Sequence, residues 1–82
     1  MPVIHVNIWK GIDQEKIEYI IENITRVFVD MGVPAHAVSV LIHEIPKEHW
    51  GEGGETCAVK FKDIEPWKHG KSRYFTKIMK IV

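Results

Sequence analysis

The sequence contains little that could stabilise or anchor a small chain other than a folded core. Cys57 is the single cysteine among 82 residues, so no internal disulfide can form. The longest uncharged apolar runs, such as residues 38–42, are far too short to span a bilayer. No apolar signal segment follows Met1, because His5 and Lys10 interrupt the first ten residues. We therefore expect a cytoplasmic protein without a membrane partner.

Apolar residues are abundant enough for one folded core. Hydrophobic residues make up 45% of the sequence and charged residues 27%, a composition that excludes intrinsic disorder. The length leaves room for one domain only. Because small domains without cross-links commonly gain stability by association, we expect a homo-oligomer.

The formal net charge of zero hides two segments of opposite sign. Residues 1–66 contain six basic and eleven acidic side chains, whereas residues 67–82 contain five basic and no acidic ones. We therefore divide the chain into a domain, 1–66, and a basic C-terminal extension, 67–82. The extension can be interpreted as a solvated helix or as a flap that pairs with the acidic body. A nucleic-acid partner is not expected, because a near-neutral chain lacks the usual electrostatic footprint. A domain that binds anions or nucleic acid through residues 67–82 is a third, weaker hypothesis.

Hydrophobic periodicity predicts a strand, a helix and a second strand in the first 45 residues. Residues 3–9 alternate as a strand does, and Asp13 then suits the N-cap of a helix. The helix should end at Gly32, before a second strand at 38–45. The predicted apolar face of the helix comprises Ile17, Ile20, Ile21, Ile24, Val27, Phe28 and Met31. This order predicts an α/β (α+β) fold, a βαβ unit with parallel strands.

The remaining residues predict a hairpin, a short strand and a C-terminal helix. Three glycines within 51–54 indicate a tight hairpin turn, and residues 56–62 alternate as a short strand would. From Trp67 onward, an amphipathic helix is predicted with the apolar residues Tyr74, Phe75, Ile78, Met79 and Ile81. Since one helix can cover only one face of a two-stranded sheet, the other face should be covered by self-association.

The metal-ligating and nucleophilic residue types form no recognisable motif. They are His5, His36, His43, His49 and Cys57. No two of them have a standard ligand spacing, and no base is identifiable beside the cysteine. The glycine-rich turn lacks the lysine and hydroxyl residue of a phosphate-binding loop. We therefore expect neither a metal nor an organic cofactor.

Pro2 is the residue with the most distinctive chemistry. Removal of Met1 would leave Pro2 with a secondary amine at the N-terminus, whereas retention of Met1 would keep its nitrogen in a tertiary amide. α-Amino groups ordinarily titrate at about 7.7–8.0, and burial against apolar walls favours the neutral form. A processed Pro2 could therefore serve as a general base near neutral pH.

The order of these features over about the first 58 residues resembles the 4-oxalocrotonate tautomerase family. The residues that carry the resemblance are Pro2, the strand to Trp9, Gly11, Asp13, Val38–Glu44 and the run His49, Trp50, Gly51, Gly53, Gly54 and Glu55. The resemblance implies a βαβ unit with a C-terminal hairpin, assembled from dimers into a hexamer. It also implies that Pro2 moves a proton between carbon and oxygen of a small 2-oxo or enol acid, in a pocket walled by Trp9 and Trp50.

Two positions depart from the family pattern. Ile12 and Ser39 stand where the family has substrate-binding arginines, and neither can offer a carboxylate a cationic fork. Ser39 and His43 are therefore the candidate polar contacts to substrate, and Lys10 or Arg73 could supply a cation instead. The alternative interpretation is a catalytically silent, oligomeric binding or structural relative of the tautomerases.

Overall fold

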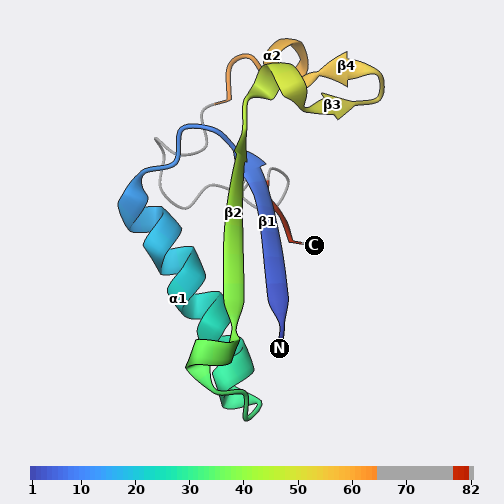
Figure 1. Ribbon diagram of the computed structural model, residues 1–82. Coiled ribbons are helices and arrows are strands. Elements are labelled where there is room, and N and C mark those ends of the chain that lie inside the picture. The colour runs from blue at the N-terminus through green and yellow to red at the C-terminus, as the bar shows by residue number, and fades with distance from the viewer. Residues whose placement is uncertain (65–78, 82) are drawn as a thin grey trace.

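The computed structural model describes residues 1–64 and 79–81, and its centre is a β-α-β unit (Figure 1). Strand β1 spans Val3–Trp9, helix α1 spans Gln14–Asp30 and strand β2 spans Ser39–Ile45. The two strands are parallel and stay in register along their whole length. The predicted fold class and the parallel pairing are therefore confirmed.

Helix α1 begins and ends where the sequence indicated. The Asp13 carboxylate accepts a hydrogen bond from the backbone N–H of Lys16 at 2.9 Å and also pairs with its ammonium group at 2.8 Å. These hydrogen bonds lower the pKa of Asp13 below its ordinary value. At the other end, Gly32 has a φ of 96°, and the N–H of Val33 bonds the carbonyl of Phe28 at 3.0 Å. This left-handed closure is one that glycine adopts without strain.

The main core lies between α1 and one face of the sheet. Ile4, Val6 and Ile8 of β1 are at most 7% exposed, as the alternation along the strand predicted. The helix residues that contact this core are Ile17, Ile20, Ile24 and Phe28. Val27 and Met31, also predicted on the apolar face, are 56% and 72% exposed. Both residues follow the helical spacing, but neither packs against the core between α1 and the sheet.

Among the described residues, no helix covers the opposite face of the sheet, which we call the open face. On this face lie Val3, His5 and Asn7 of β1 and Leu41 and His43 of β2, none of them buried. Val3 and Leu41 are 55% and 40% exposed. The helix therefore covers one face only, as expected for two parallel strands.

Short 3₁₀ turns precede and follow β2, at Ala35–Ala37 and Lys47–His49. A hairpin and a helical turn come next in the chain. Strand β3, Gly51–Glu52, pairs antiparallel with β4, Glu55–Thr56, which confirms the hairpin. Its two turn residues are Gly53 and Gly54, with φ values of 63° and 87°. Such positive angles at both central positions suit glycine and match the twist of the strands.

The predicted strand over residues 56–62 is wrong, because α2 forms a helical turn at Cys57–Lys60. A strand would have placed Cys57, Val59 and Phe61 on one face. In the helical turn, Cys57 and Phe61 lie four residues apart on the same side and both pack in one cluster, while Val59 is 68% exposed. Both patterns pair Cys57 with Phe61, so the exposure of Val59 is what distinguishes the helical turn from the predicted strand.

Strand β5, Met79–Ile81, lies antiparallel against the free edge of β1, so the sheet order is β2-β1-β5 (Figure 1). The predicted C-terminal helix is therefore wrong at Met79 and Ile81, where backbone pairing with an open sheet edge is available. The rest of that prediction, residues 67–78, lies outside the described residues. Within the described chain, no helix has the length and apolar character needed to cross a membrane.

Candidate active site

Pro2 and Ser39 meet at one end of the sheet. Pro2 immediately precedes β1, and its carbonyl accepts a hydrogen bond from the backbone N–H of Ser39 at 3.0 Å. Pro2 is partly buried, whereas Met1 is 93% exposed. The sheet therefore fixes the position of Pro2 and leaves the preceding methionine accessible in the single chain.

Trp9 and Trp50 meet at the opposite end of the sheet. Their rings lie edge to face, with centroids 6.4 Å apart. Trp9 is 2% exposed and packs on the buried Cys57, with Phe61 and Ile64 completing a second hydrophobic cluster. Trp9 therefore mainly supports this cluster, and Trp50 is the more exposed ring of the pair.

Lys47 stabilises this second cluster, a role that the sequence did not indicate. Its ammonium group donates to the carbonyl of Phe61 at 2.8 Å and to that of Ile64 at 2.9 Å. It also lies 5.1 Å from the centre of a Trp9 ring, within range of a cation–π interaction. No local signal could have indicated this role, because its partners follow it by 14 and 17 residues.

Cys57 is a poor candidate for a nucleophile. Burial raises the pKa of its thiol, and the Glu52 carboxylate adds to that effect. Nearby Lys60 and Lys47 and a hydrogen bond with Trp9 act in the opposite direction but do not reverse it. A buried thiol with a raised pKa is seldom the reactive thiolate, so the structure favours packing as the role of Cys57.

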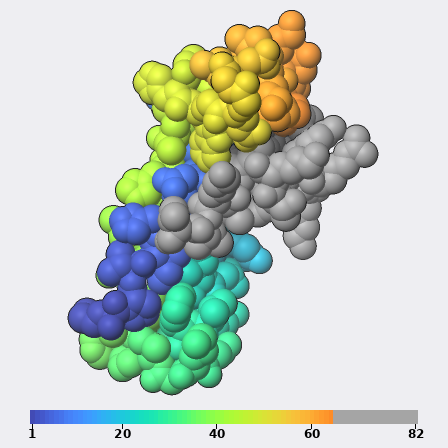
Figure 2. Space-filling model, turned by 90° about the vertical axis from the view of Figure 1, so that its right-hand side faces the viewer, coloured from blue at the N-terminus to red at the C-terminus, as the bar shows by residue number. Residues whose placement is uncertain are grey.

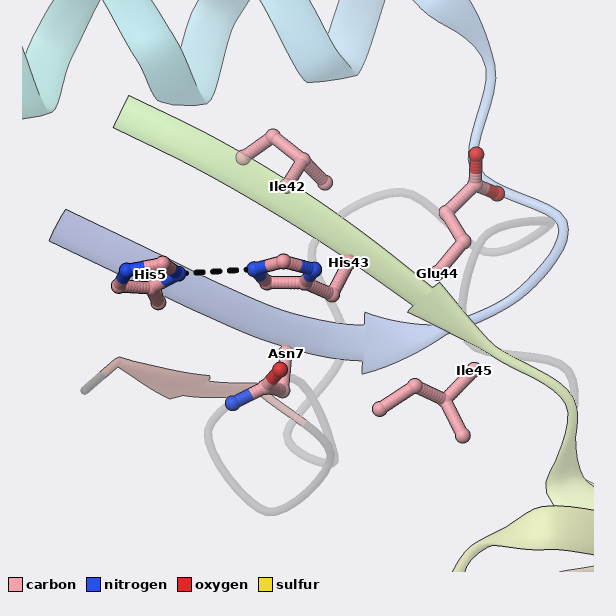
Figure 3. A pocket seen from close by; sticks show the side chains of 6 residues that line it. All are labelled: His5, Asn7, Ile42, His43, Glu44 and Ile45. Atoms are coloured by element: carbon pink, nitrogen blue, oxygen red, sulfur yellow. Dashed lines mark hydrogen bonds between the residues drawn. The ribbon is translucent and has the colours of Figure 1, made fainter. Parts of the chain in front are cut away.

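His43 lies between the two ends, in a shallow depression on the open face of the sheet (Figure 3). The depression is lined by His5, Asn7, Ile42, His43, Glu44 and Ile45. Nδ1 of His5 and Nε2 of His43 are 2.9 Å apart, and the two ring planes differ by only 11°. With centroids 5.1 Å apart, the rings meet edge to edge through an N–H···N bond rather than stacking face to face. The alternation of apolar and polar residues in β1 predicted that His5 lies on this face. Its contact with His43 depends on the register between β1 and β2.

The candidate residues thus fall at two ends of one strand. Pro2 and Trp9 are separated by the length of β1, about 23 Å at the usual rise of a strand. Figure 2 shows the same separation, with the N-terminal residues at one end of the molecule and residues 46–64 at the other. Pro2 and Trp50 of one chain therefore cannot line the same small pocket.

The two positions that lack arginine differ in their surroundings. Ile12 is 7% exposed and belongs to the main core, while Ser39 is exposed at the start of β2. Arg26, the one arginine in the described part of the chain, lies 3.9 Å from Glu22 on α1. The described residues therefore offer Pro2 no arginine in place of the two that are missing. Among them, too, no three histidine, cysteine or acidic side chains converge as metal ligands would.

Comparisons with known proteins agree with this architecture. The sequence model of the family described as "Tautomerase enzyme" matches residues 2–60. A 2-hydroxymuconate tautomerase from Comamonas testosteroni is 38% identical over 55 residues, which cover 66% of this chain and 87% of that protein. A second 2-hydroxymuconate tautomerase, from Pseudomonas sp. strain CF600, is 36% identical over 59 residues, covering 71% and 94%.

A solved structure shows the same fold. TomN, described as a 4-oxalocrotonate tautomerase homologue in the tomaymycin biosynthetic pathway, superposes with a TM-score of 0.71 at 28% identity. The match covers 76% of this chain and 97% of TomN. Together with the match over residues 2–60, these similarities establish that the chain belongs to the tautomerase enzyme family.

Proposed function

We propose that this protein catalyses keto–enol proton transfer on a small 2-oxo or enol acid, with Pro2 as the general base after removal of Met1. The observation that carries the proposal is the placement of Pro2 at the start of β1. Its carbonyl is bonded to Ser39, so its nitrogen is held at a defined point beside the start of β2. The 93% exposure of Met1 supports its removal, and family membership supports the class of reaction.

The reaction requires a neutral amine. The nitrogen of Pro2 would take the proton from the hydroxyl of the enol while the C–O bond becomes a carbonyl, and the same proton would then be delivered to carbon. One O–H bond is broken and one C–H bond is formed, so no cofactor is needed. Apolar surroundings favour the neutral amine, and exclusion of water limits loss of the proton to solvent.

The proposed site is completed by a second copy of the chain. Because Pro2 and Trp50 lie at opposite ends of β1, a pocket containing both needs the N-terminal end of one copy beside the hairpin end of another. The open sheet face, with Val3 and Leu41 exposed, offers apolar surface for such contacts. We therefore propose a homo-oligomer, and a hexamer built from dimers remains our preferred assembly.

The substrate we propose carries one carboxylate. A dicarboxylate would need two cationic contacts, but Ile12 is in the core and Ser39 offers only a hydroxyl and backbone groups. Ser39 is the proposed polar contact beside Pro2. His43 lies four residues farther along β2, so the proposed contact from His43, like the pocket wall from Trp50, comes from a second copy, in which Trp9 supports Trp50. A mono-acid enol should therefore be converted faster than 2-hydroxymuconate.

The test measures mass and activity on the same preparation. Intact mass spectrometry shows whether Met1 is absent, and ketonisation of phenylenolpyruvate and of 2-hydroxymuconate is then followed for wild type and Pro2→Ala. We expect loss of Met1, a preference for phenylenolpyruvate, and a fall of roughly 10²-fold or more in kcat/KM for the variant. The fraction that retains Met1 is the matched control and should be inactive.

Two outcomes would contradict the proposal. Equal rates for wild type and Pro2→Ala would exclude Pro2 as the base. Complete retention of Met1 in the native host, with no turnover of either enol, would favour the alternative of a catalytically silent oligomeric relative.

A further inference from the structure

The edge of β1 that faces away from β2 is the basis of a further inference. At the two ends of β1, the carbonyl of Pro2 and the N–H of Lys10 both bond to the β2 side, each at 3.0 Å. Backbone groups of alternate residues in a strand point to opposite edges, so the even-numbered residues of β1 face β2. The N–H and C=O of Asn7 therefore point to the other edge, where Asn7 is paired with Lys80 of β5.

Of the strands that the structure describes, β5 is the one that covers this edge. Unpaired N–H and C=O groups on a strand edge form a template for another strand, and proteins commonly cover such edges. The cover here is short, because β5 contains three residues. The strand that it covers, β1, is more buried than β2, since Val6 and Ile8 are 0% exposed. A small element thus protects the edge of the central strand.

We propose that β5 competes with a second copy of this chain for the edge of β1, so that the C-terminal extension controls self-association. The orientation of β5 supports this partner. β5 runs antiparallel to β1, and the β1 strand of a second copy related by a twofold axis would also run antiparallel to it. The same backbone groups around Asn7 would serve either occupant, so only one can bind at a time.

The charge distribution favours the intramolecular pairing. Residues 67–82 carry a net charge of +5 and residues 1–66 a net charge of −5. The extension and the body of one chain therefore attract each other, while two bodies without their extensions repel. Salt screens both interactions and should shift the balance toward pairing between copies.

The expected effect on association follows from the population of chains with an open edge. Each copy must release β5 before the two β1 strands can pair, so the dissociation constant of the dimer rises as the inverse square of the open fraction. If about one chain in ten is open, docking of β5 weakens dimerisation about 100-fold. This inference concerns self-association and does not depend on the chemistry of Pro2.

The experiment uses the full chain with single substitutions in β5. Lys80→Pro removes the N–H that points toward Asn7, while Met79→Pro removes an N–H that points away from β1 and is the matched control. Lys80→Gln removes the same charge as Lys80→Pro but keeps every backbone N–H. Sedimentation velocity over a range of concentrations, at low and high salt, gives the dissociation constant of each variant.

We expect Lys80→Pro to dimerise about 10- to 100-fold more tightly than wild type at low salt, and Met79→Pro and Lys80→Gln to stay within a few-fold of wild type. The difference should shrink at high salt. Equal or weaker association of Lys80→Pro relative to Met79→Pro would overturn the proposal. Hydrogen exchange at the amide of Asn7, measured on dilute monomer, provides a second test. Equally fast exchange in wild type and Lys80→Pro would show that β5 does not occupy the edge.

Discussion

Replacing Lys47 by methionine should loosen the second hydrophobic cluster without unfolding the main core. The substitution keeps most of the apolar stem but removes the donor to the carbonyls of Phe61 and Ile64. Hydrogen bonds to a charged group contribute about 1.5–3 kcal/mol each; at a partly buried site we expect about 2–3 kcal/mol for the pair. Local opening of the cluster should then be roughly 30- to 150-fold more frequent.

The buried thiol of Cys57 reports this opening. Its reaction with a disulfide reagent under native conditions should accelerate by up to about 30- to 150-fold, while circular dichroism remains that of the wild type. The positive charge of Lys47 lowers the pKa of Cys57, so its removal alone would leave less thiolate and slow the reaction. Acceleration therefore measures exposure. Lys10→Met, at an exposed lysine after β1, is the control. If Lys47→Met reacts no faster than Lys10→Met, the two hydrogen bonds do not hold the cluster together.

Two further predictions concern Ile12 and Asp13, which precede the N-terminal end of α1. Ile12→Arg restores a residue type that the family uses, but places a charge in the main core; we expect a loss of about 2–5 kcal/mol in urea unfolding and no gain in turnover of 2-hydroxymuconate. Wild-type stability together with faster turnover of the diacid would show that position 12 can reach the substrate. Asp13→Ala removes the N-cap and should lower the urea midpoint at pH 7. Because the pKa of Asp13 is lowered in the folded state, its stabilisation is present above its ordinary value of 3.8 and is lost as the pH falls below it. A difference between wild type and variant that does not change between pH 7 and pH 2 would contradict this assignment.

The sequence predicted the secondary structure correctly wherever one hydrophobic periodicity dominated. The alternation of Ile4, Val6 and Ile8 and the helical spacing after Asp13 each specify one element, so the β-α-β unit could be predicted. At residues 56–62 the two periodicities compete, because alternation and i,i+4 spacing both place Cys57 with Phe61. The sequence does not choose between the two patterns; in the folded chain, both side chains pack in the cluster around Trp9 from a helical turn.

For the candidate site, too, the sequence revealed some features and only the structure revealed others. The sequence did reveal the residue types: a proline after Met1, polar positions on two strands, and tryptophans beside the turn after β1 and the glycine-rich hairpin. It did not reveal the pairing of these residues, because the partners His5 and His43, and Trp9 and Trp50, are about 40 residues apart in the sequence. The structure places Pro2 with Ser39, His43 with His5, and Trp50 with Trp9, in three places along the sheet.

The amino-acid sequence by itself determined the order of the main elements, their apolar faces and the opposite charges of the domain and its extension. These properties depend on neighbours within one or two turns and on simple counts. Tertiary structure alone decided that Ile12 is a core residue, that Lys47 closes the second cluster and that β5 lies on the edge of β1. Each of these depends on contacts between residues far apart in the chain, for which no local pattern carries a signal.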